Sequence, residues 1–356
     1  MKIGVPREKK SEEYRVSITP YGAYELIKEG HTVFVEDNAG IHAGFKNEDY
    51  VNVGCKILDS EEKIFTHAEL IVKVKEPQLD EIKYLNKNHV LFCYLHLASS
   101  DELTEKLRKT GALCLAYETL QERNHSLPLL IPMSEIAGRL SVQKGAWFLE
   151  KNNGGKGKLV SGGTGVEKCN VVILGGGTVG YNAAHVAAGM GAAVTIFELN
   201  STRIRFLEEV LPKNVQCLYA SSHYINKYIA QCDLLIGAIL VPGKKTPKII
   251  TKEHLKIMEP RSVFVDVAID QGGIAETSKP TTHKEPIFIE HNILHYCVTN
   301  MPAAVPITST LALTQATLPY IKKLAHVECK IDKILNDEIL RTAVNIYNYE
   351  VLVDIF

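Results

Sequence analysis

The sequence contains few of the features that mark nucleic-acid-binding or membrane proteins. Its 40 Lys and Arg nearly balance its 41 Asp and Glu among 356 residues, and no basic run suited to a phosphate backbone occurs. No stretch approaches the ~20 consecutive apolar residues of a membrane span. The segment Met1–Val5 enters a strand directly, without a charged and apolar leader. We therefore expect a cytoplasmic protein that acts on small molecules, with no nucleic-acid or membrane partner.

The eight cysteines suggest neither a metal site nor a disulfide framework. They are scattered along the chain, mostly among apolar residues, and no C-x-x-C pair occurs. This distribution is typical of reduced core residues in a cytosolic protein. We expect no metal ion in the functional site.

One stretch, residues 171–200, reads as a βαβ unit of the dinucleotide-binding type. The apolar run Val171–Leu174 predicts a strand, and Gly175–Gly180 forms a G-x-G-x-x-G turn. A helix rich in small residues follows the turn and leads to a second strand that closes on Glu198. Because strand, turn, helix and acidic residue occur in the required order, the stretch predicts dinucleotide binding rather than a purely structural turn.

Each glycine of the turn has a separate task. Gly175 permits the sharp change of direction, Gly177 leaves room for a pyrophosphate, and Gly180 lets the helix pack closely on the strand. Free N–H groups at the start of the helix can then bind the phosphates.

The residue that closes the unit, Glu198, favours NAD over NADP. Its carboxylate can accept hydrogen bonds from the adenine-ribose hydroxyls and would repel a 2′-phosphate. Arg203 and Arg205 follow it and could bind a phosphate, although both are expected on the solvated face of the next helix.

The chain is too long for one ordinary core, and strands alternate with helices along both halves. We predict an α/β protein of two Rossmann-like, doubly wound domains with a cleft between them. Residues 1–130 and 305–356 form a discontinuous substrate domain, and residues 131–304 form the dinucleotide-binding domain. Closure of the two domains over the substrate is expected to exclude water.

Helices are predicted where the chain passes between these domains. The apolar spacing from Met133 to Leu149 predicts a long connecting helix. Near the C-terminus, prolines including Pro319 frame a helix at Ile307–Thr317, and Leu335–Val353 reads as a last amphipathic helix. These C-terminal helices are expected to complete the first domain.

Two lysines interrupt an otherwise apolar strand predicted over Leu70–Lys75. Lys73 and Lys75 alternate with valine, so both are expected on one face of that strand. Lys75 stands at the carboxyl end, the edge of an open α/β sheet where ligands bind. A lysine that snorkels from a strand end into solvent is the structural alternative.

Two further ionisable residues, His96 and Arg15, are candidates for the same site as Lys75. His96 ends the apolar strand Val90–His96, where a histidine alone is typically a satisfied core residue, and Arg15 alone reads as a surface charge. Together, the Arg15 and Lys75 cations suit a substrate carboxylate, because a guanidinium grips it bidentately and an ammonium adds charge. His96 can then shuttle a proton at near-neutral pH.

Two carboxylates, Asp266 and Asp270, lie near the end of a strand in the second half, before a glycine pair. Such residues either cap a helix or take part in proton chemistry. We predict a structural role for Asp266, and both roles stay open for Asp270. The apolar loops Ala238–Pro242 and Thr299–Ala303 suit a nicotinamide pocket, with simple loop packing as the alternative.

These stretches together resemble the alanine dehydrogenase family, which shares its fold with the NAD(H)-binding part of proton-translocating transhydrogenase. The matching blocks are MKIGVPRE with Glu13–Val16, VKVKEP at 72–77, YLHLA at 94–98, PMSEIAGRLSVQ at 132–143, LGGGTVG at 174–180, LVPG at 240–243, VDVAIDQGG at 265–273 and NMPAAVPITST at 300–310. They cover nearly the whole chain in the order of the family.

The resemblance implies the roles of the residues in these blocks. Arg15 and Lys75 would bind the carboxylate of pyruvate or alanine, and His96 and Asp270 would be the catalytic acid/base residues. The implied NAD contacts are Ser134, Thr178, Val179, Glu198, Arg203, Ile239, Leu240, Val267, Asn300 and Met301. The chain departs from the usual family residues at Glu198, Ala220, Lys279, Ala303 and Ile307. Members of the family are commonly hexamers.

The resulting hypothesis is the reversible, NAD-dependent oxidative deamination of L-alanine to pyruvate and ammonium. Two alternatives stay open. One is a dehydrogenase for a different small 2-oxo acid or amino acid, because the cation pair recognises any 2-oxo acid. The other is a non-catalytic NAD(H)-binding subunit that serves a membrane partner.

Overall fold

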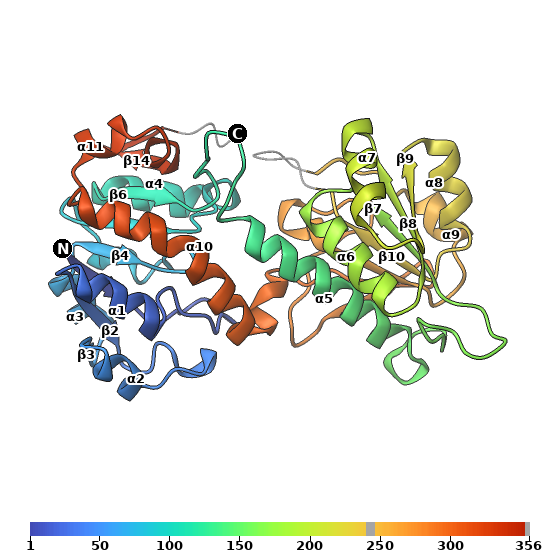
Figure 1. Ribbon diagram of the computed structural model, residues 1–356, viewed down its shortest axis with the longest axis horizontal. Coiled ribbons are helices and arrows are strands. Elements are labelled where there is room, and N and C mark those ends of the chain that lie inside the picture. The colour runs from blue at the N-terminus through green and yellow to red at the C-terminus, as the bar shows by residue number, and fades with distance from the viewer. Residues whose placement is uncertain (240–245, 353–356) are drawn as a thin grey trace. The chain divides into compact units, whose positions relative to one another are not determined.

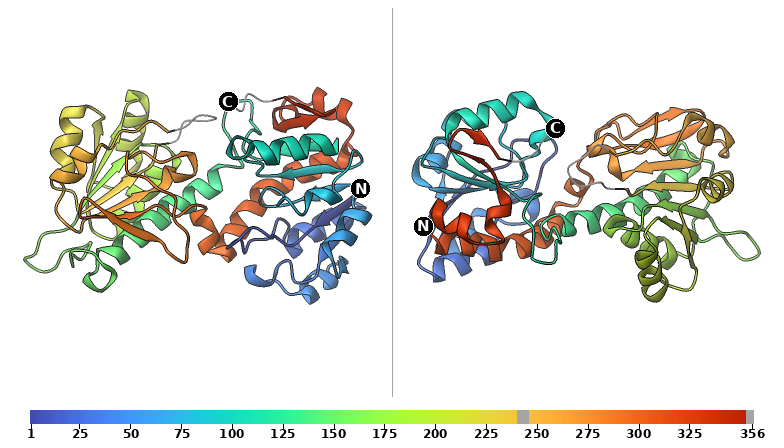
Figure 2. Two further views of the ribbon diagram at one scale, coloured as in Figure 1. Left: turned by 180° about the vertical axis from the view of Figure 1, so that it is seen from behind. Right: turned by 90° about the horizontal axis from the view of Figure 1, so that it is seen from above.

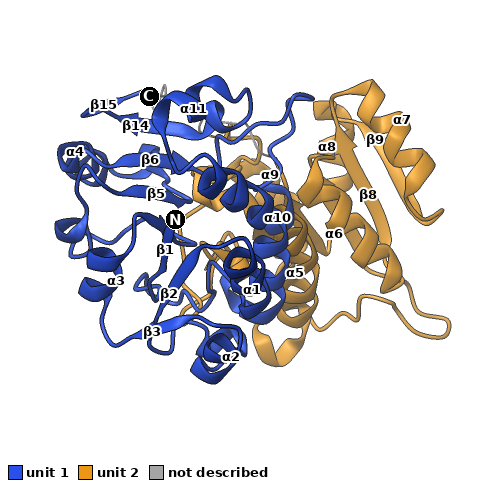
Figure 3. Cartoon of the chain, turned by 60° about the vertical axis from the view of Figure 1, so that its left-hand side comes forward, with its two compact units in different colours: residues 1–133, 303–356 blue, residues 134–302 orange. Residues whose placement is uncertain are grey.

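The computed structural model describes residues 1–239 and 246–352, and it divides into two compact units (Figure 1). Unit 1 comprises Met1–Met133 and Ala303–Phe356, and unit 2 comprises Ser134–Pro302 (Figure 3). Each unit is built on one mostly parallel sheet with flanking helices, which confirms the predicted class of two Rossmann-like α/β domains. The functional assignment of the two segments stays a prediction.

The sheet of unit 1 has the strand order β15-β14-β6-β5-β4-β1-β2-β3. The strands are β1 (Lys2–Val5), β2 (Thr32–Glu36), β3 (Lys56–Leu58), β4 (Leu70–Val72), β5 (Val90–Cys93), β6 (Leu113–Ala116), β14 (Val344–Tyr347) and β15 (Glu350–Val351). Strands β1 to β6 are parallel, and the strand order reverses between β1 and β4. Ligands of open α/β sheets bind at such a switch point, beyond the carboxyl ends of the strands.

Helices from both segments of unit 1 cover this sheet. They are α1 (Pro20–Lys28), α2 (Asn47–Asn52), α3 (Glu61–His67), α4 (Asp101–Thr110), α10 (Pro306–His326) and α11 (Ile331–Asn336). In the right-hand view of Figure 2, α4 lies on one face of the sheet, with α1 and α10 on the other. In the sequence, Thr19 followed by Pro20 predicts the start of a helix, and helix α1 begins there. The Thr19 hydroxyl accepts a hydrogen bond from the Gly22 N–H, and Pro20 occupies the first turn.

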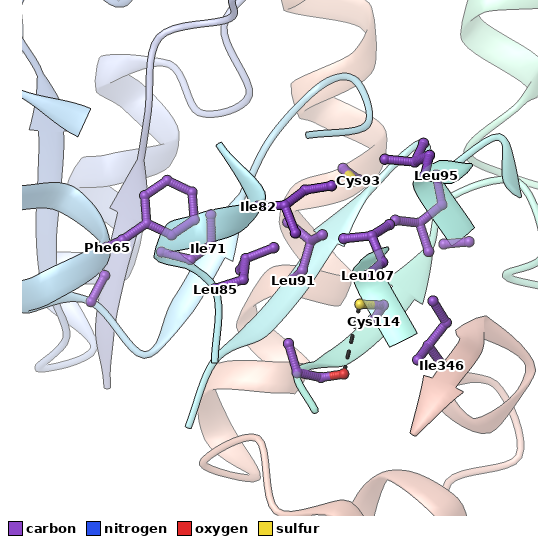
Figure 4. Close-up of a cluster of buried hydrophobic side chains, with 14 of the residues drawn as sticks. Phe65, Ile71, Ile82, Leu85, Leu91, Cys93, Leu95, Leu107, Cys114 and Ile346 are labelled. Atoms are coloured by element: carbon purple, nitrogen blue, oxygen red, sulfur yellow. Dashed lines mark hydrogen bonds between the residues drawn. The ribbon is translucent and has the colours of Figure 1, made fainter. Parts of the chain in front are cut away.

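A hydrophobic core lies under α3 and α4 (Figure 4). Phe65 of α3 and Leu107 of α4 pack with Ile71, Leu91 and Cys114 of three adjacent strands. These side chains are at most 2% exposed. The strands are therefore buried on this face, and only their ends and loops can present polar groups to a ligand.

The sheet of unit 2 has the order β12-β13-β11-β10-β7-β8-β9. Its strands are β7 (Asn170–Leu174), β8 (Ala193–Glu198), β9 (Val215–Tyr219), β10 (Leu234–Gly237), β11 (Val263–Asp266), β12 (Ile287–Glu290) and β13 (Ile293–Tyr296). Its helices are α5 (Ile131–Leu149), which begins in the last residues of the first segment of unit 1, α6 (Thr178–Gly189), α7 (Ser201–Val210), α8 (Ser222–Ile229) and α9 (Lys252–Ile257). The order reverses between β7 and β10, so the glycine-rich turn after β7 lies at the switch point.

Two predictions for the C-terminal segment are wrong. Helix α10 does not stop near Pro319 but continues to His326, because Tyr320, Ile321 and Leu324 beyond the proline are buried in unit 1. This burial outweighs the backbone hydrogen bond that a proline removes.

The predicted helix over Leu335–Val353 is also wrong for the part that the structure describes. After α11 ends at Asn336, Val344 and Ile346 pair with β6 in an antiparallel strand. The β-branched side chains of both residues suit a strand, and Asn348 and Tyr349 at positive φ make the tight turn to β15.

Candidate active site

Three cationic or ionisable side chains meet beyond adjacent strands of unit 1. Arg15 lies between β1 and α1, Lys75 follows β4, and His96 follows β5. Because β1, β4 and β5 are neighbours and parallel, their carboxyl ends lie at one edge of the sheet. The Lys75 Nζ lies 3.0 Å from the His96 Nε2, and the Arg15 charge is close enough to lower the pKa of His96.

His96 has an unusual backbone conformation for a residue with a side chain. Its φ of 48° and ψ of 40° are left-handed, and both oxygens of Glu118 accept hydrogen bonds from the Leu95 and His96 backbone N–H groups. A non-glycine residue persists in this region only where its surroundings fix it. Strand β5 ends at Cys93, so the predicted strand Val90–His96 was too long.

The imidazole of His96 is held in its neutral form. Burial lowers its pKa well below the ordinary value, and the Lys75, Lys10 and Arg15 charges lower it further. An ammonium can only donate, so the Nε2 of His96 accepts from Lys75 and the ring proton lies on Nδ1. The ring also stacks on Tyr94, with 5.8 Å between centroids.

Arg15 is only 2% exposed, in contrast to the surface position that its sequence context alone suggested. Its Nε donates to Glu13 Oε1 at 2.6 Å, its Nη2 donates to Glu13 Oε2, and its Nη1 contacts the Met133 sulfur at 2.9 Å. Burial disfavours the charge, but Glu13 more than offsets this and raises the pKa of the guanidinium. The cation is therefore permanent and its orientation is fixed.

Lys73 does not share a strand face with Lys75 as predicted. Strand β4 ends at Val72, and the Lys73 side chain is fully buried. Its Nζ lies 2.9 Å from Glu81 and 3.3 Å from Glu8. Lys73 thus belongs to a buried charge cluster, whereas Lys75 belongs to the site.

Sequence reasoning missed three acidic residues that hold the site: Glu8, Glu13 and Glu118. Glu8 and Glu13 lie in the loop between β1 and α1, and Glu118 lies just after β6. Each carboxylate is buried or partly buried and contacts the backbone or side chain of a predicted site residue. The sequence offered no specific signal for them, because an acidic residue in a loop after a strand has the same pattern as a solvated surface charge.

The glycine-rich turn of unit 2 has the shape that a dinucleotide requires. Gly175 has a φ of +105°, and a side chain there would come within 2.6 Å of the Ala238 carbonyl oxygen. A side chain at Gly180 would overlap the Gly175 carbonyl oxygen. At Gly177, by contrast, an added Cβ would meet no atom within 4 Å, so open space lies before the first turn of α6. These residues fit a pyrophosphate.

Glu198 and Arg203 both support this turn. The Glu198 carboxylate accepts from the Gly176 N–H at 2.9 Å and from the Leu199 and Asn200 N–H groups. Arg203 is not on a solvated helix face as expected from sequence, because its Nε donates to the Gly176 carbonyl at 2.7 Å. Arg205 is exposed, as expected.

The other predicted cofactor residues follow carboxyl ends of the sheet or begin a helix of unit 2. Thr178 and Val179 begin α6, and Ser134 lies half-buried in the first turns of α5. Ile239 follows β10, Val267 follows β11, and Asn300 and Met301 follow β13. Leu240 lies outside the described residues. Their contacts with a cofactor stay predictions.

Asp266 and Asp270 have different environments. Asp266 is fully buried and accepts from the Ala268 N–H, the Ile274 N–H and the Ser278 hydroxyl, so it organises the loop after β11 as predicted. Asp270 is exposed on that loop, and its Oδ1 accepts from the Asn300 N–H at 3.3 Å. An exposed carboxylate on a fixed loop is available for proton transfer.

Neither a metal centre nor a membrane span is found among residues 1–239 and 246–352. No group of three His, Cys, Asp or Glu side chains in this part of the chain is placed to hold a metal ion. No helix there is long and apolar enough to cross a membrane. All eight cysteines are free thiols.

Comparison with known proteins identifies the family. Residues 4–137 match the alanine dehydrogenase/PNT N-terminal domain, and residues 141–354 match the corresponding C-terminal domain. The chain is 47% identical to the alanine dehydrogenase of Bacillus subtilis over 349 residues, which cover 98% of this chain and 92% of the relative. It is also 47% identical to the alanine dehydrogenase of Mycolicibacterium smegmatis, over 91% of this chain and 88% of the relative.

Solved structures agree with this relationship. A structure named L-alanine dehydrogenase is 46% identical with a TM-score of 0.95, covering 99% of this chain and 97% of that one. The transhydrogenase from Sinorhizobium meliloti, 18% identical with a TM-score of 0.85 and full coverage of both chains, shares the fold. The chain belongs to the alanine dehydrogenase/PNT family.

Proposed function

We propose that this protein is an NAD-dependent L-alanine dehydrogenase. It converts L-alanine, NAD⁺ and water into pyruvate, ammonium, NADH and a proton, and it also catalyses the reverse reaction. One observation carries the proposal: the Lys75 ammonium lies 3.0 Å from a neutral His96 at the ligand-binding edge of unit 1, in a chain whose relatives are alanine dehydrogenases.

Arg15 and Lys75 bind the substrate carboxylate. Glu13 raises the pKa of Arg15 and keeps its guanidinium charged, and both side chains are held by neighbours rather than by solvent. An ordered cation pair loses little side-chain entropy when a carboxylate binds. The pair recognises any 2-oxo acid, so the methyl side chain of pyruvate is selected by other contacts.

Unit 2 holds the cofactor. The turn Gly175–Gly180 binds the pyrophosphate at the start of α6, and Glu198 accepts hydrogen bonds from the adenine ribose and disfavours a 2′-phosphate. When bound, the nicotinamide ring supplies a hydride acceptor for the α-hydrogen of alanine.

The proton transfers belong to His96 and Asp270. Loss of the α-hydrogen as hydride leaves an imine of pyruvate, and water then adds to its carbon. The neutral Nε2 of His96 takes a proton from the attacking water, which gives a carbinolamine. His96 and Asp270 then return protons as the carbinolamine expels ammonia. Closure of the protein over the substrate keeps bulk water away from the hydride step.

We also propose a cytoplasmic homohexamer. Eight free thiols suit a reducing compartment, and several large apolar side chains of unit 2, including Trp147 and Leu159, are more than half exposed. Sedimentation equilibrium of the purified chain tests the assembly, with a mass of six chains as the expected result.

Substrate profiling tests the reaction against the alternatives. We expect NADH oxidation with ammonium to be fastest with pyruvate and slower with 2-oxo acids of longer side chain. A preference for a longer 2-oxo acid would indicate another amino-acid dehydrogenase. NADH binding without turnover of any 2-oxo acid would indicate a nucleotide-binding subunit.

A further inference from the structure

We propose that Glu8 is a positioning residue for substrate binding: its carboxylate holds the backbone of Val74 and Lys75 and thereby fixes the Lys75 ammonium beside His96. The inference rests on the proposed function, in which Lys75 binds the substrate carboxylate. Glu8 does not touch the substrate in this scheme and acts through Lys75.

The hydrogen bonds beyond the end of β4 show how Glu8 acts. On the side facing β5, backbone pairing continues past Val72, because the Lys73 N–H donates to Phe92 and the Tyr94 N–H donates to Val74. On the side facing β1, no strand continues, since β1 ends at Val5.

There the Glu8 carboxylate takes the place of the missing strand. Its Oε1 accepts a hydrogen bond from the Val74 backbone N–H at 2.6 Å, and its Oε2 lies 3.4 Å from the backbone nitrogen of Lys75. The segment that carries Lys75 is therefore held on both sides, by a backbone carbonyl and N–H on one and by a carboxylate on the other. A lysine on a held backbone needs to order only its side chain when substrate binds.

The Glu8 side chain is itself fixed by charge. It is 2% exposed, and its Oε2 lies 3.3 Å from the Nζ of Lys73, which also pairs with Glu81 at 2.9 Å. A buried carboxylate with a cation and backbone donors around it has few alternative positions. Lys73, which has no place in the catalytic scheme, thus acquires a role in locating Glu8.

The charge state of Glu8 changes at near-neutral pH. Burial raises its pKa to about 7, against the opposing effect of Lys73, and Glu13 and Glu81 add to the rise. Glu13 raises the pKa of Arg15 and burial lowers the pKa of His96, so neither of these groups changes its charge in this range. Protonation below about pH 7 weakens the acceptor for Val74 and Lys75.

The test is the substitution Glu8→Gln in the full chain. The amide keeps the volume and one acceptor for Val74, but its NH₂ group faces the Lys73 ammonium and the Lys75 N–H. We expect the dissociation constant of pyruvate for the NADH-loaded protein to rise about tenfold, with little change in kcat and an unchanged affinity for NADH. Quenching of NADH fluorescence measures both affinities.

Glu61→Gln is the matched control. Glu61 is a buried carboxylate that pairs with Lys9 beside the same charge cluster, but it contacts neither Val74 nor Lys75. Removing the charge of Glu61 should leave the dissociation constant of pyruvate unchanged. In the wild type, pyruvate binding should also weaken as the pH falls through about 7, and this dependence should be reduced in Glu8→Gln.

The outcomes separate the inference from the proposed function. If Lys75→Ala binds pyruvate as the wild type does, the substrate role of Lys75 is wrong, and the role of Glu8 with it. If Lys75→Ala weakens binding but Glu8→Gln does not, or if Glu61→Gln weakens it equally, only the role of Glu8 is overturned. Should Glu8→Gln not fold, Glu8→Asp, which keeps the charge but reaches less far, must show the weaker pyruvate binding.

Discussion

His96 combines three constraints that suit it to proton transfer. Its backbone is fixed in a left-handed conformation by Glu118, its Nε2 faces the Lys75 ammonium, and its neutral form is favoured by burial. The Nε2 of the neutral imidazole accepts a hydrogen bond from Lys75. Once the substrate takes over the Lys75 ammonium, this nitrogen can accept a proton. The same neighbours explain why a histidine after an apolar strand is not simply a core residue here.

The substitution His96→Ala tests this role. We expect kcat for pyruvate reduction to fall ~10²- to 10⁴-fold, because the proton transfers lose their acceptor. The affinity for NADH should stay unchanged, since the residues predicted to bind the cofactor belong to unit 2. His67→Ala, which removes an exposed histidine of unit 1, is the control and should be fully active. Unchanged turnover in His96→Ala would reject the assignment.

A second residue, Glu61, links folding stability to pH. Burial raises its pKa to about 7 from an ordinary 4.5, and Glu81 raises it further while Lys9 opposes the rise. For a group whose pKa is raised on folding, the stabilisation is complete below the unfolded pKa and is lost as the pH rises through the folded one. Glu61 therefore lowers stability progressively between pH 4.5 and about 7.

Glu61→Gln removes this titration. We expect the free energy of unfolding of the variant, relative to the wild type, to increase as the pH is raised from about 5 to about 8. Urea unfolding at both pH values measures the difference. A difference that is constant, or that decreases with pH, would show that Glu61 ionises normally in the folded protein.

At the scale of elements, the turn between β7 and α6 depends on glycine for two distinct reasons. Gly177 faces open space, whereas Gly180 packs against the Gly175 carbonyl oxygen. The end of the same helix provides a contrast, because a side chain at Gly189 would meet no atom within 4 Å. The motif predicted the different tasks of Gly177 and Gly180, and the structure adds that Gly189 has open space around it.

The substitutions Gly180→Ala and Gly189→Ala test the difference between a crowded and an open glycine of the same helix. Gly180→Ala should displace the turn, lower the stability by ~1–3 kcal/mol and weaken NADH binding at least about tenfold. Gly189→Ala should raise the stability by ~0.5–1 kcal/mol, because alanine loses less conformational entropy in a helix, and should leave NADH binding intact. Thermal denaturation and NADH fluorescence provide the two readouts. Equal NADH affinity in both variants would contradict the proposed packing at Gly180.

Sequence patterns predicted the elements whose signals are local. The α1 cap at Thr19 and the βαβ unit around Gly175–Gly180 depend on residues close together in the chain, and both are present. The end of β4 and the course of the tail were missed because they are decided by distant partners. Glu8 holds the chain after Val72, and β6 pairs with the tail.

The same distinction applies to the site. Arg15, Lys75 and His96 could be proposed from their positions after apolar strands, and the structure brings Lys75 and His96 into contact. Glu13 and Glu118 could not, because an acidic residue in a polar loop has the same sequence signature as a surface charge. Only the fold shows that these carboxylates are directed inward at the cations and backbone of the site.

At the scale of the whole molecule, each unit carries one half of the proposed reaction on its own sheet. Unit 1 supplies the cations and the histidine, and unit 2 supplies the glycine-rich turn, Glu198 and Asp270. In both, the groups lie at or beyond the carboxyl ends of parallel strands on either side of the switch point. Substitutions of these unit 1 residues should therefore weaken pyruvate binding or turnover and leave the affinity for NADH unchanged. Hydride transfer should require the residues of both units.

The most direct measurement is the initial rate of the reaction in both directions. NADH formation is followed with NAD⁺ and L-alanine at alkaline pH, and NADH consumption is followed with pyruvate and ammonium near neutrality. We expect turnover in both directions, and Lys75→Ala should bind NADH like the wild type but turn over far more slowly. Absence of turnover in either direction, with NADH still bound in a fluorescence titration, would contradict the assignment as an alanine dehydrogenase.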